Sequence, residues 1–180
     1  PSREPPAPAA PDTPSSVAGP SLSQAPSPPP PPSPSFDPAL SGRHLPESWR
    51  GNILTNDFRA NRVCRFVLSD DGSGFASREQ VELIKTPHVA FRPIDVKMGP
   101  DGAIYIADWY NPIIQHGEVD FRDPRRDHTR GRIWRVTAKG RPLVERPRLV
   151  GASTEALLEA LKAPEDWTRH HAKRVLKERG

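Results

Sequence analysis

The chain has 180 residues, a formal net charge of +4 and one cysteine. This length allows one domain and part of another, and the cysteine count excludes an internal disulfide and a cysteine-rich zinc or haem motif. No apolar run reaches the length of a transmembrane helix, so we expect no membrane span in this chain.

Residues 1–44 differ in composition from the rest of the chain. Sixteen of the 24 prolines lie within the first 46 residues, where Ser and Ala fill half of the other positions. Such a segment has too few large apolar side chains to build a core. We therefore expect a disordered or polyproline-like arm over residues 1–44.

Six arginines lie between Arg122 and Arg135 and concentrate positive charge there. Three acids, Asp120, Asp123 and Asp127, interleave with them, and no row of aromatic residues accompanies the cluster. Nucleic-acid surfaces combine basic residues with stacking platforms or long basic stripes. We therefore expect no nucleic-acid partner.

Between residues 45 and 138 short runs rich in Val, Ile and aromatic residues alternate with turn sequences. A Gly-Pro-Asp-Gly turn at residues 99–102 joins two of these runs and has the chemistry of a tight hairpin. The pattern predicts strands. They are expected at residues 51–57, 62–68, 80–85, 94–98, 103–107 and 131–137.

An internal similarity relates two parts of this region. Residues 51–58 align with residues 102–109, and residues 62–67 align with residues 132–137 across a longer connection. Repeats near 50 residues with about four short strands are typical of propeller blades. The sequence thus predicts an all-β propeller fragment of about two blades over residues 45–138.

The C-terminal part has a helical pattern. A basic, proline-punctuated linker over residues 139–152 precedes Ser153 and Thr154, either of which can cap a helix. Pro164 separates this first helix from a second one, in which Trp167 and Val175 share an apolar face. Two short helices of this kind predict the start of a HEAT-like helical array over residues 153–180.

The segment FRPIDVKMGPDGAIYIADWY, the loop around His116 and the segment GRIWRVT together resemble a known family. It comprises the membrane-bound dehydrogenase-like propeller proteins of planctomycetes and verrucomicrobia, which are related to glucose/sorbosone dehydrogenases that use pyrroloquinoline quinone. LLEALKAPEDWTRHHAKRVLKERG looks like the opening of the HEAT segment in that family. The resemblance implies the C-terminal fragment of a six-bladed propeller.

The resemblance also implies an activity: oxidation of a sugar or related alcohol in the periplasm or cell envelope. Electrons would pass to a cytochrome domain with haem c, downstream of this chain, and calcium is a possible second cofactor. We expect no turnover by this chain alone, since the arm stands where earlier blades would contact the quinone. The candidate residues are a catalytic base (His116 or His128), quinone-binding cations (Arg92 and Arg126) and calcium ligands (Asp108, Glu118 and Asp120).

Two other interpretations remain open. Asp108, like Asp57 in the earlier repeat, can tie down the end of a strand, and the Arg and Asp residues of the loop can form salt bridges that hold it in place. The whole chain can also serve as a non-catalytic propeller and HEAT scaffold that binds protein or carbohydrate.

Overall fold

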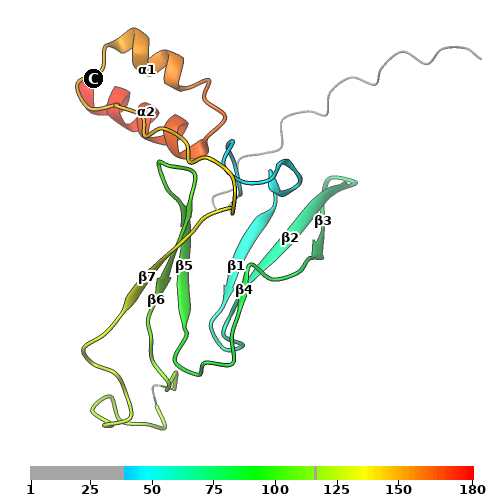
Figure 1. Cartoon of the computed structure of the whole chain (residues 1–180), viewed down its shortest axis with the longest axis vertical. Helices are drawn as coiled ribbons and strands as arrows, with labels where there is room; N and C mark the ends of the chain where they lie inside the picture. The colour runs from blue at the N-terminus through cyan, green and yellow to red at the C-terminus, as the bar shows by residue number, and fades with distance from the viewer. Residues whose placement is uncertain (1–38, 116) are drawn as a thin grey trace, which may run out of the picture. The chain divides into compact units, whose positions relative to one another are not determined.

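The computed structural model describes residues 39–115 and 117–180, which form two antiparallel β-sheets and two α-helices (Figure 1). The first sheet contains β1 (Ile53–Asp57), β2 (Arg62–Asp71), β3 (Gly74–Glu79) and β4 (Ile84–Lys85). The second contains β5 (Pro93–Met98), β6 (Ile104–Asp108) and β7 (Arg132–Val136). A 3-10 turn, η1 (Glu47–Trp49), precedes β1, and the helices are α1 (Thr154–Ala160) and α2 (Asp166–Arg179).

β2 is the central strand of the first sheet. β1 pairs with one edge of β2, in a register that sets Asp57 opposite Arg62. β3 and β4 share the other edge: β3 pairs with the end of β2, and β4 pairs with its first two residues. All six residues of β3 are exposed, so that this strand is held mainly by its backbone ladder.

The second sheet is a simple meander, in which β6 lies between β5 and β7. Gly99–Gly102 forms the tight turn between β5 and β6, closed by the Gly99 N–H, which donates to the Ala103 carbonyl at 2.8 Å. Gly102 has a φ of +79°, and a Cβ there would lie 2.7 Å from the Cβ of His44. Glycine is therefore required at this position both by the backbone conformation and by the space.

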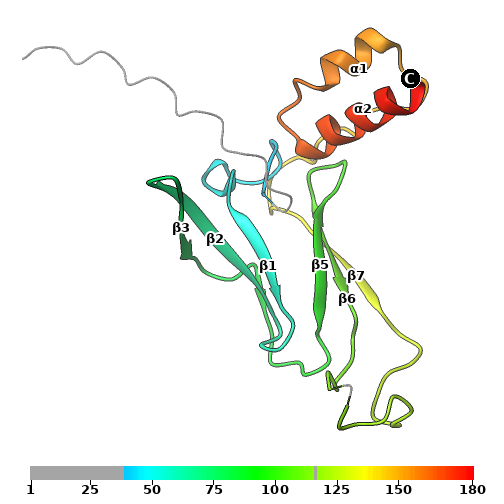
Figure 2. The ribbon, with the colours of Figure 1, turned by 180° about the vertical axis from the view of Figure 1, so that it is seen from behind.

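The main core lies where the two sheets meet. β1 and β5 are in contact and run side by side in Figure 1 and in the opposite view of Figure 2. Buried residues alternate along β6, as expected for a strand with one face in a core. The core side chains are Leu40, Leu45, Leu54, Val63, Phe91, Val96, Ile104 and Ile106.

The two helices pack on each other through a second, smaller core that includes Leu157 and Ala172. The predicted cap is confirmed, because the Ser153 hydroxyl accepts a hydrogen bond from the Ala156 N–H at 3.2 Å. The start of α2 is bound to the segment before β1: the Asp166 N–H donates to the Ser41 hydroxyl at 2.9 Å. Neither α1 nor α2, the helices of the described residues, has the length and apolar character to cross a bilayer.

The predicted fold class is wrong. The described residues form a small mixed α/β arrangement without propeller closure, and the second sheet has three strands instead of the four of a blade. The internal similarity corresponds to two antiparallel hairpin-like pairs, β1–β2 and β6–β7. It does not extend to a fourth strand, because residues 137–153 after β7 form turns and irregular structure. The two helices likewise form one packed pair and no HEAT array.

Candidate functional site

The long connection between β6 and β7 is organised by the buried guanidinium of Arg126, which is 5% exposed. Its Nε donates to the Asp120 carbonyl at 3.0 Å, and its Nη1 donates to the Ile113 carbonyl at 3.0 Å. Its Nη2 donates to the carbonyls of Gln115 and Val119. The guanidinium thus gathers four backbone carbonyls of one loop, which lacks regular secondary structure to pair them.

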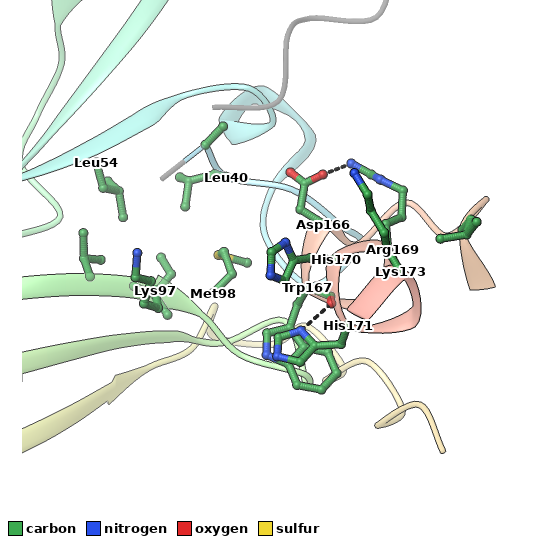
Figure 3. A pocket seen from close by; sticks show the side chains of 14 residues that line it. Leu40, Leu54, Lys97, Met98, Asp166, Trp167, Arg169, His170, His171 and Lys173 are labelled. Carbon is green, nitrogen blue, oxygen red and sulfur yellow. Dashed lines mark hydrogen bonds and ion pairs between the residues drawn. The ribbon is translucent and has the colours of Figure 1, made fainter. Parts of the chain in front are cut away.

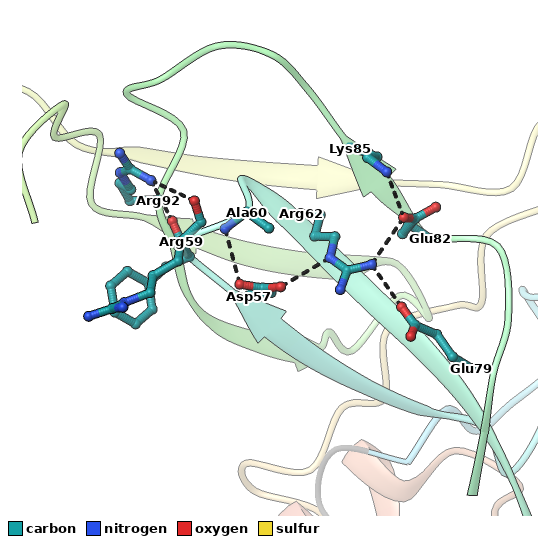
Figure 4. Close-up of polar contacts among 9 residues, drawn as sticks. Asp57, Arg59, Ala60, Arg62, Glu79, Glu82, Lys85 and Arg92 are labelled. Atoms are coloured by element: carbon teal, nitrogen blue, oxygen red, sulfur yellow. Dashed lines mark hydrogen bonds and ion pairs between the residues drawn. The ribbon is translucent and has the colours of Figure 1, made fainter.

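Arg92 has a similar role at the joint between the sheets and is 7% exposed. Its Nη1 donates to the Phe58 carbonyl at 2.7 Å and to the Arg59 carbonyl at 3.3 Å, in the turn between β1 and β2 (Figure 4). Its Nε and Nη2 donate to the carbonyls of Asn111 and Pro112. Burial lowers the pKa of Arg92, with Asp108 acting in the opposite direction.

Asp108, at the end of β6, is 3% exposed and accepts three hydrogen bonds. Oδ1 accepts from the Arg92 N–H at 2.8 Å and from the Tyr110 N–H at 2.9 Å, and Oδ2 accepts from Trp134 Nε1 at 2.9 Å. Tyr110 has a φ of +53°, which is costly for an aromatic residue. The carboxylate helps to hold that conformation, and Asp108 therefore has the geometry of a strand-end tie.

The other two calcium candidates, Glu118 and Asp120, lie in the exposed part of the loop after β6. Asp120 Oδ1 accepts from the Arg122 N–H at 2.7 Å in an exposed turn, and Glu118 is exposed. Among the described residues no three His, Cys, Asp or Glu side chains come together as a possible metal site. Asp108, Glu118 and Asp120 therefore do not fit a calcium ion as a set.

The two cations expected to bind the quinone do not fit it either. A bidentate contact with a quinone carboxylate needs guanidinium N–H groups that face a ligand. In Arg92 and Arg126 these groups face backbone carbonyls and are nearly inaccessible to solvent. Arg92 and Arg126 therefore have a structural role and do not fit a quinone carboxylate.

The histidine candidates differ in position. His116 lies outside the described residues. His128 is exposed and borders an open hollow of about 420 Å³, which we name the loop hollow. The residues that line the loop hollow are Trp109, Asn111, Phe121, Arg126, Asp127, His128, Thr129 and Arg130.

The rim of the loop hollow is shaped by a turn at Asp127. Its Oδ1 accepts from the N–H groups of Thr129 at 2.9 Å and Arg130 at 3.0 Å. These bonds, led by the one from Thr129, lower the pKa of Asp127. On the other side the Phe121 ring is 61% exposed, with the Arg126 guanidinium 5.5 Å from its centroid. The hollow therefore presents an aromatic face beside imidazole and hydroxyl groups.

The outer surface of the loop carries short-range ion pairs, as the salt-bridge interpretation expects. Arg125 Nη2 lies 2.8 Å from Asp123 Oδ2, and hydrogen bonds from the Arg125 side chain and backbone lower the pKa of Asp123 to about 2. Arg130 pairs with Asp127 at 3.4 Å. These ion pairs hold the outer surface of the loop, while Arg126 binds the carbonyl groups in its interior.

Two polar centres are not indicated by the sequence patterns. Arg62 pairs with Asp57, Glu79 and Glu82 on the first sheet (Figure 4). The hydrogen bonds that Arg62 donates to Asp57 and Glu82, led by the one to Asp57, raise the pKa of Arg62. His44 is buried and bridges the carbonyl of Pro142 and the N–H of Ala138. The sequence does not indicate the His44 contacts because their partners are more than 90 residues away, and it does not indicate the Arg62 contacts because strand pairing brings Asp57, Glu79 and Glu82 to this side chain.

Comparison with known proteins finds a matching family model. The model of the family described as Domain of unknown function (DUF7133) matches residues 38–140, which is more than half of the chain. No curated protein and no solved structure matches the chain. The match covers both sheets and the loop with its hollow, and the chain belongs to the DUF7133 family.

Proposed function

We propose that this chain is a carbohydrate-binding module and that the loop hollow receives the sugar. A sugar ring offers an apolar C–H face and a rim of hydroxyl groups. Binding sites for small molecules commonly pair aromatic walls with a few placed polar groups. The observation that carries the proposal is that the exposed Phe121 ring lies in one hollow with the polar side chains of Asn111, His128 and Thr129.

The electrostatics of the loop also support a neutral ligand. Arg126 is engaged by carbonyls of the loop, and Arg130 pairs with Asp127. An anionic ligand would have to compete with these contacts. A sugar instead needs hydrogen-bond donors and acceptors at the rim, which hydroxyl and imidazole groups supply.

The test is a titration of the full chain with glucose, galactose, mannose, maltose and cellobiose, followed by NMR of the backbone amides. We expect saturable shifts at Thr129 and Arg130, with a dissociation constant on the order of 1 mM for an open site of this size. Phe121→Ala should weaken binding several-fold. Phe75→Ala removes an exposed aromatic ring from β3 and should leave binding unchanged.

The proposal fails if none of these sugars shifts the loop amides, or if the two variants bind alike. A transfer of shifts to residues outside the loop hollow would also contradict it. Because Phe121 is largely exposed, its replacement is not expected to unfold the chain.

One observation favours a second function, the oxidation of a sugar or alcohol suggested by the sequence resemblance. His128 lines the loop hollow, where a neutral imidazole can accept a hydroxyl proton from a bound sugar. The quinone and the cytochrome domain would come from outside the residues described here, and a periplasmic location follows from the same resemblance.

Binding and turnover separate these two functions. We expect His128→Gln to retain sugar binding within a few-fold, because the amide still forms hydrogen bonds, but to abolish any turnover measured with pyrroloquinoline quinone, calcium and an artificial electron acceptor. If the unaltered chain gives no turnover, the second function is rejected for this chain and the first stands.

A further inference from the structure

A cavity of about 640 Å³ lies between the two sheets and α2 (Figure 3). It shares no lining residue with the loop hollow. We name it the helix cavity. Its size falls within the range of about 300–1,000 Å³ that is usual for small-molecule sites. Its floor consists of aliphatic side chains from both sheets, and its rim is formed by one face of α2 together with Lys97.

The walls of the helix cavity are apolar and firmly placed. Leu54 and Ile104 on the floor are 1% and 0% exposed, so a ligand would first meet the partly exposed Met98, Leu161 and Trp167. The Trp167 and His171 rings stack with centroids 3.7 Å apart and an interplanar angle of 14°. His171 Nδ1 lies 2.8 Å from the Trp167 carbonyl, which fixes the stack on the helix.

The rim carries an excess of positive charge. Lys97, Arg169 and Lys173 line it, and Asp166 is the acid among the lining residues. Asp166 forms an ion pair with Arg169, and Lys97 lies 3.9 Å from Asp95. Lys173 is exposed and forms no ion pair with another residue of the described part of the chain. The net charge at the mouth is therefore positive, above an apolar interior.

The geometry points to a binding site for a single-chain amphipathic carboxylate, such as a medium-chain fatty acid. Its aliphatic tail would lie along Met98, Leu161 and the Trp167–His171 stack, and its carboxylate would meet Lys173 at the rim. Charge complementarity selects the acid over a neutral alcohol of the same length. A sugar has no apolar tail for such a cavity, so this site is independent of the loop hollow.

The experiment is isothermal titration of the full chain with monomeric decanoate and with 1-decanol. We expect saturable binding of decanoate and clearly weaker binding of the alcohol. Lys173→Glu reverses the charge at the rim and should weaken decanoate binding about three- to tenfold. Lys177→Glu makes the same change one turn further along α2, outside the cavity lining, and serves as the matched control.

A second variant tests the interior. Met98→Trp places a larger side chain at the cavity wall and should abolish decanoate binding, while the unfolding temperature shows whether the variant is folded. If it does not fold, the comparison of Lys173→Glu with Lys177→Glu decides by itself.

Several outcomes would overturn the inference. These are the absence of saturable decanoate binding, equal affinity for decanoate and decanol, and equal effects of the two lysine variants. Binding to phosphatidylglycerol vesicles without binding to decanoate would assign the basic face of α2 to a membrane surface instead, and would equally reject the cavity site.

Discussion

The carboxylate of Asp108 accepts a hydrogen bond from the indole of Trp134 at 2.9 Å and thereby joins the end of β6 to the neighbouring strand β7. The same carboxylate accepts the backbone N–H groups of Arg92 and Tyr110. One side chain thus fixes the entry to β5, the exit of β6 and the middle of β7. The long loop begins directly after this point.

Replacing Asp108 with Asn should destabilise the fold by about 1–3 kcal/mol, because Asn has one acceptor oxygen where Asp has two. With that oxygen on the N–H groups of Arg92 and Tyr110, the amide NH2 group faces the Trp134 N–H and this donor loses its partner. Urea unfolding measures the change. Trp134→Phe keeps a ring and removes the donor, so that the double variant should show less than the sum of the two losses. Additive losses would contradict the contact.

Replacing Arg126 with Lys should loosen the loop while the sheets persist. A single ammonium group cannot span the four carbonyls that the guanidinium reaches. We expect local opening to become easier by about 2 kcal/mol, seen as faster amide exchange over residues 113–126. Arg125→Lys alters the exposed pair with Asp123 and is the matched control. Equal exchange in both variants would show that Arg126 does not organise the loop.

Much of the strand pattern could be predicted from the sequence. Strands were expected close to the positions of β1, β2, β5, β6 and β7, because these carry alternating or continuous apolar residues. β3 is not indicated by the sequence, because its residues, GFASRE, show no apolar face, and all six of them are exposed. It exists because the turn at Gly72 returns the chain along β2.

The assembly of the strands could not be predicted in the same way. Similar sequences do recur in the two sheets, at β1–β2 and at β6–β7. This repeat does not determine which further strands pair with the edges of each sheet. β3 and β4 share one edge of β2, which a blade model does not allow. Tertiary packing, and not local propensity, decides this.

The roles of the polar residues were partly predictable. Asp108 was recognised as a possible strand-end tie, since Asp recurs at that position in both repeats. Arg92 and Arg126 were expected to face a ligand, but they face backbone carbonyls. Every residue has a backbone carbonyl group, so the sequence does not show which carbonyl groups an arginine binds. A buried arginine of this kind cannot be told from an exposed one by its sequence position.

His44 offers a third prediction. Its Nδ1 lies 2.8 Å from the Pro142 carbonyl and its Nε2 lies 2.9 Å from the Ala138 nitrogen. His44→Phe should cost about 2–4 kcal/mol, because both backbone groups lose their buried partner. Thermal unfolding measures the loss, and His128→Phe, at an exposed site, should change stability little. A His44 variant as stable as the unaltered chain would reject the bridge.

The last prediction concerns the attachment of α2 at low pH. Glu165 is 4% exposed, and Arg43 contacts it through Nε at 2.9 Å, Nη2 at 3.2 Å and its backbone N–H at 3.2 Å. Burial raises the pKa of Glu165, but the hydrogen bonds from Arg43 outweigh this and lower it below its ordinary value of 4.5. The folded chain therefore binds the proton less readily than the unfolded chain does.

A lowered carboxyl pKa stabilises the fold at pH values above the unfolded pKa, and this stabilisation is lost as the pH falls through the folded pKa. We expect the unfolding temperature to drop as the pH falls below about 4.5, and part of this drop to vanish in Glu165→Gln. Glu159→Gln, at an exposed ion pair on α1, is the control and should keep the full pH dependence. If Glu165→Gln and Glu159→Gln follow the same acid profile, the Arg43–Glu165 contact does not govern how α2 is held.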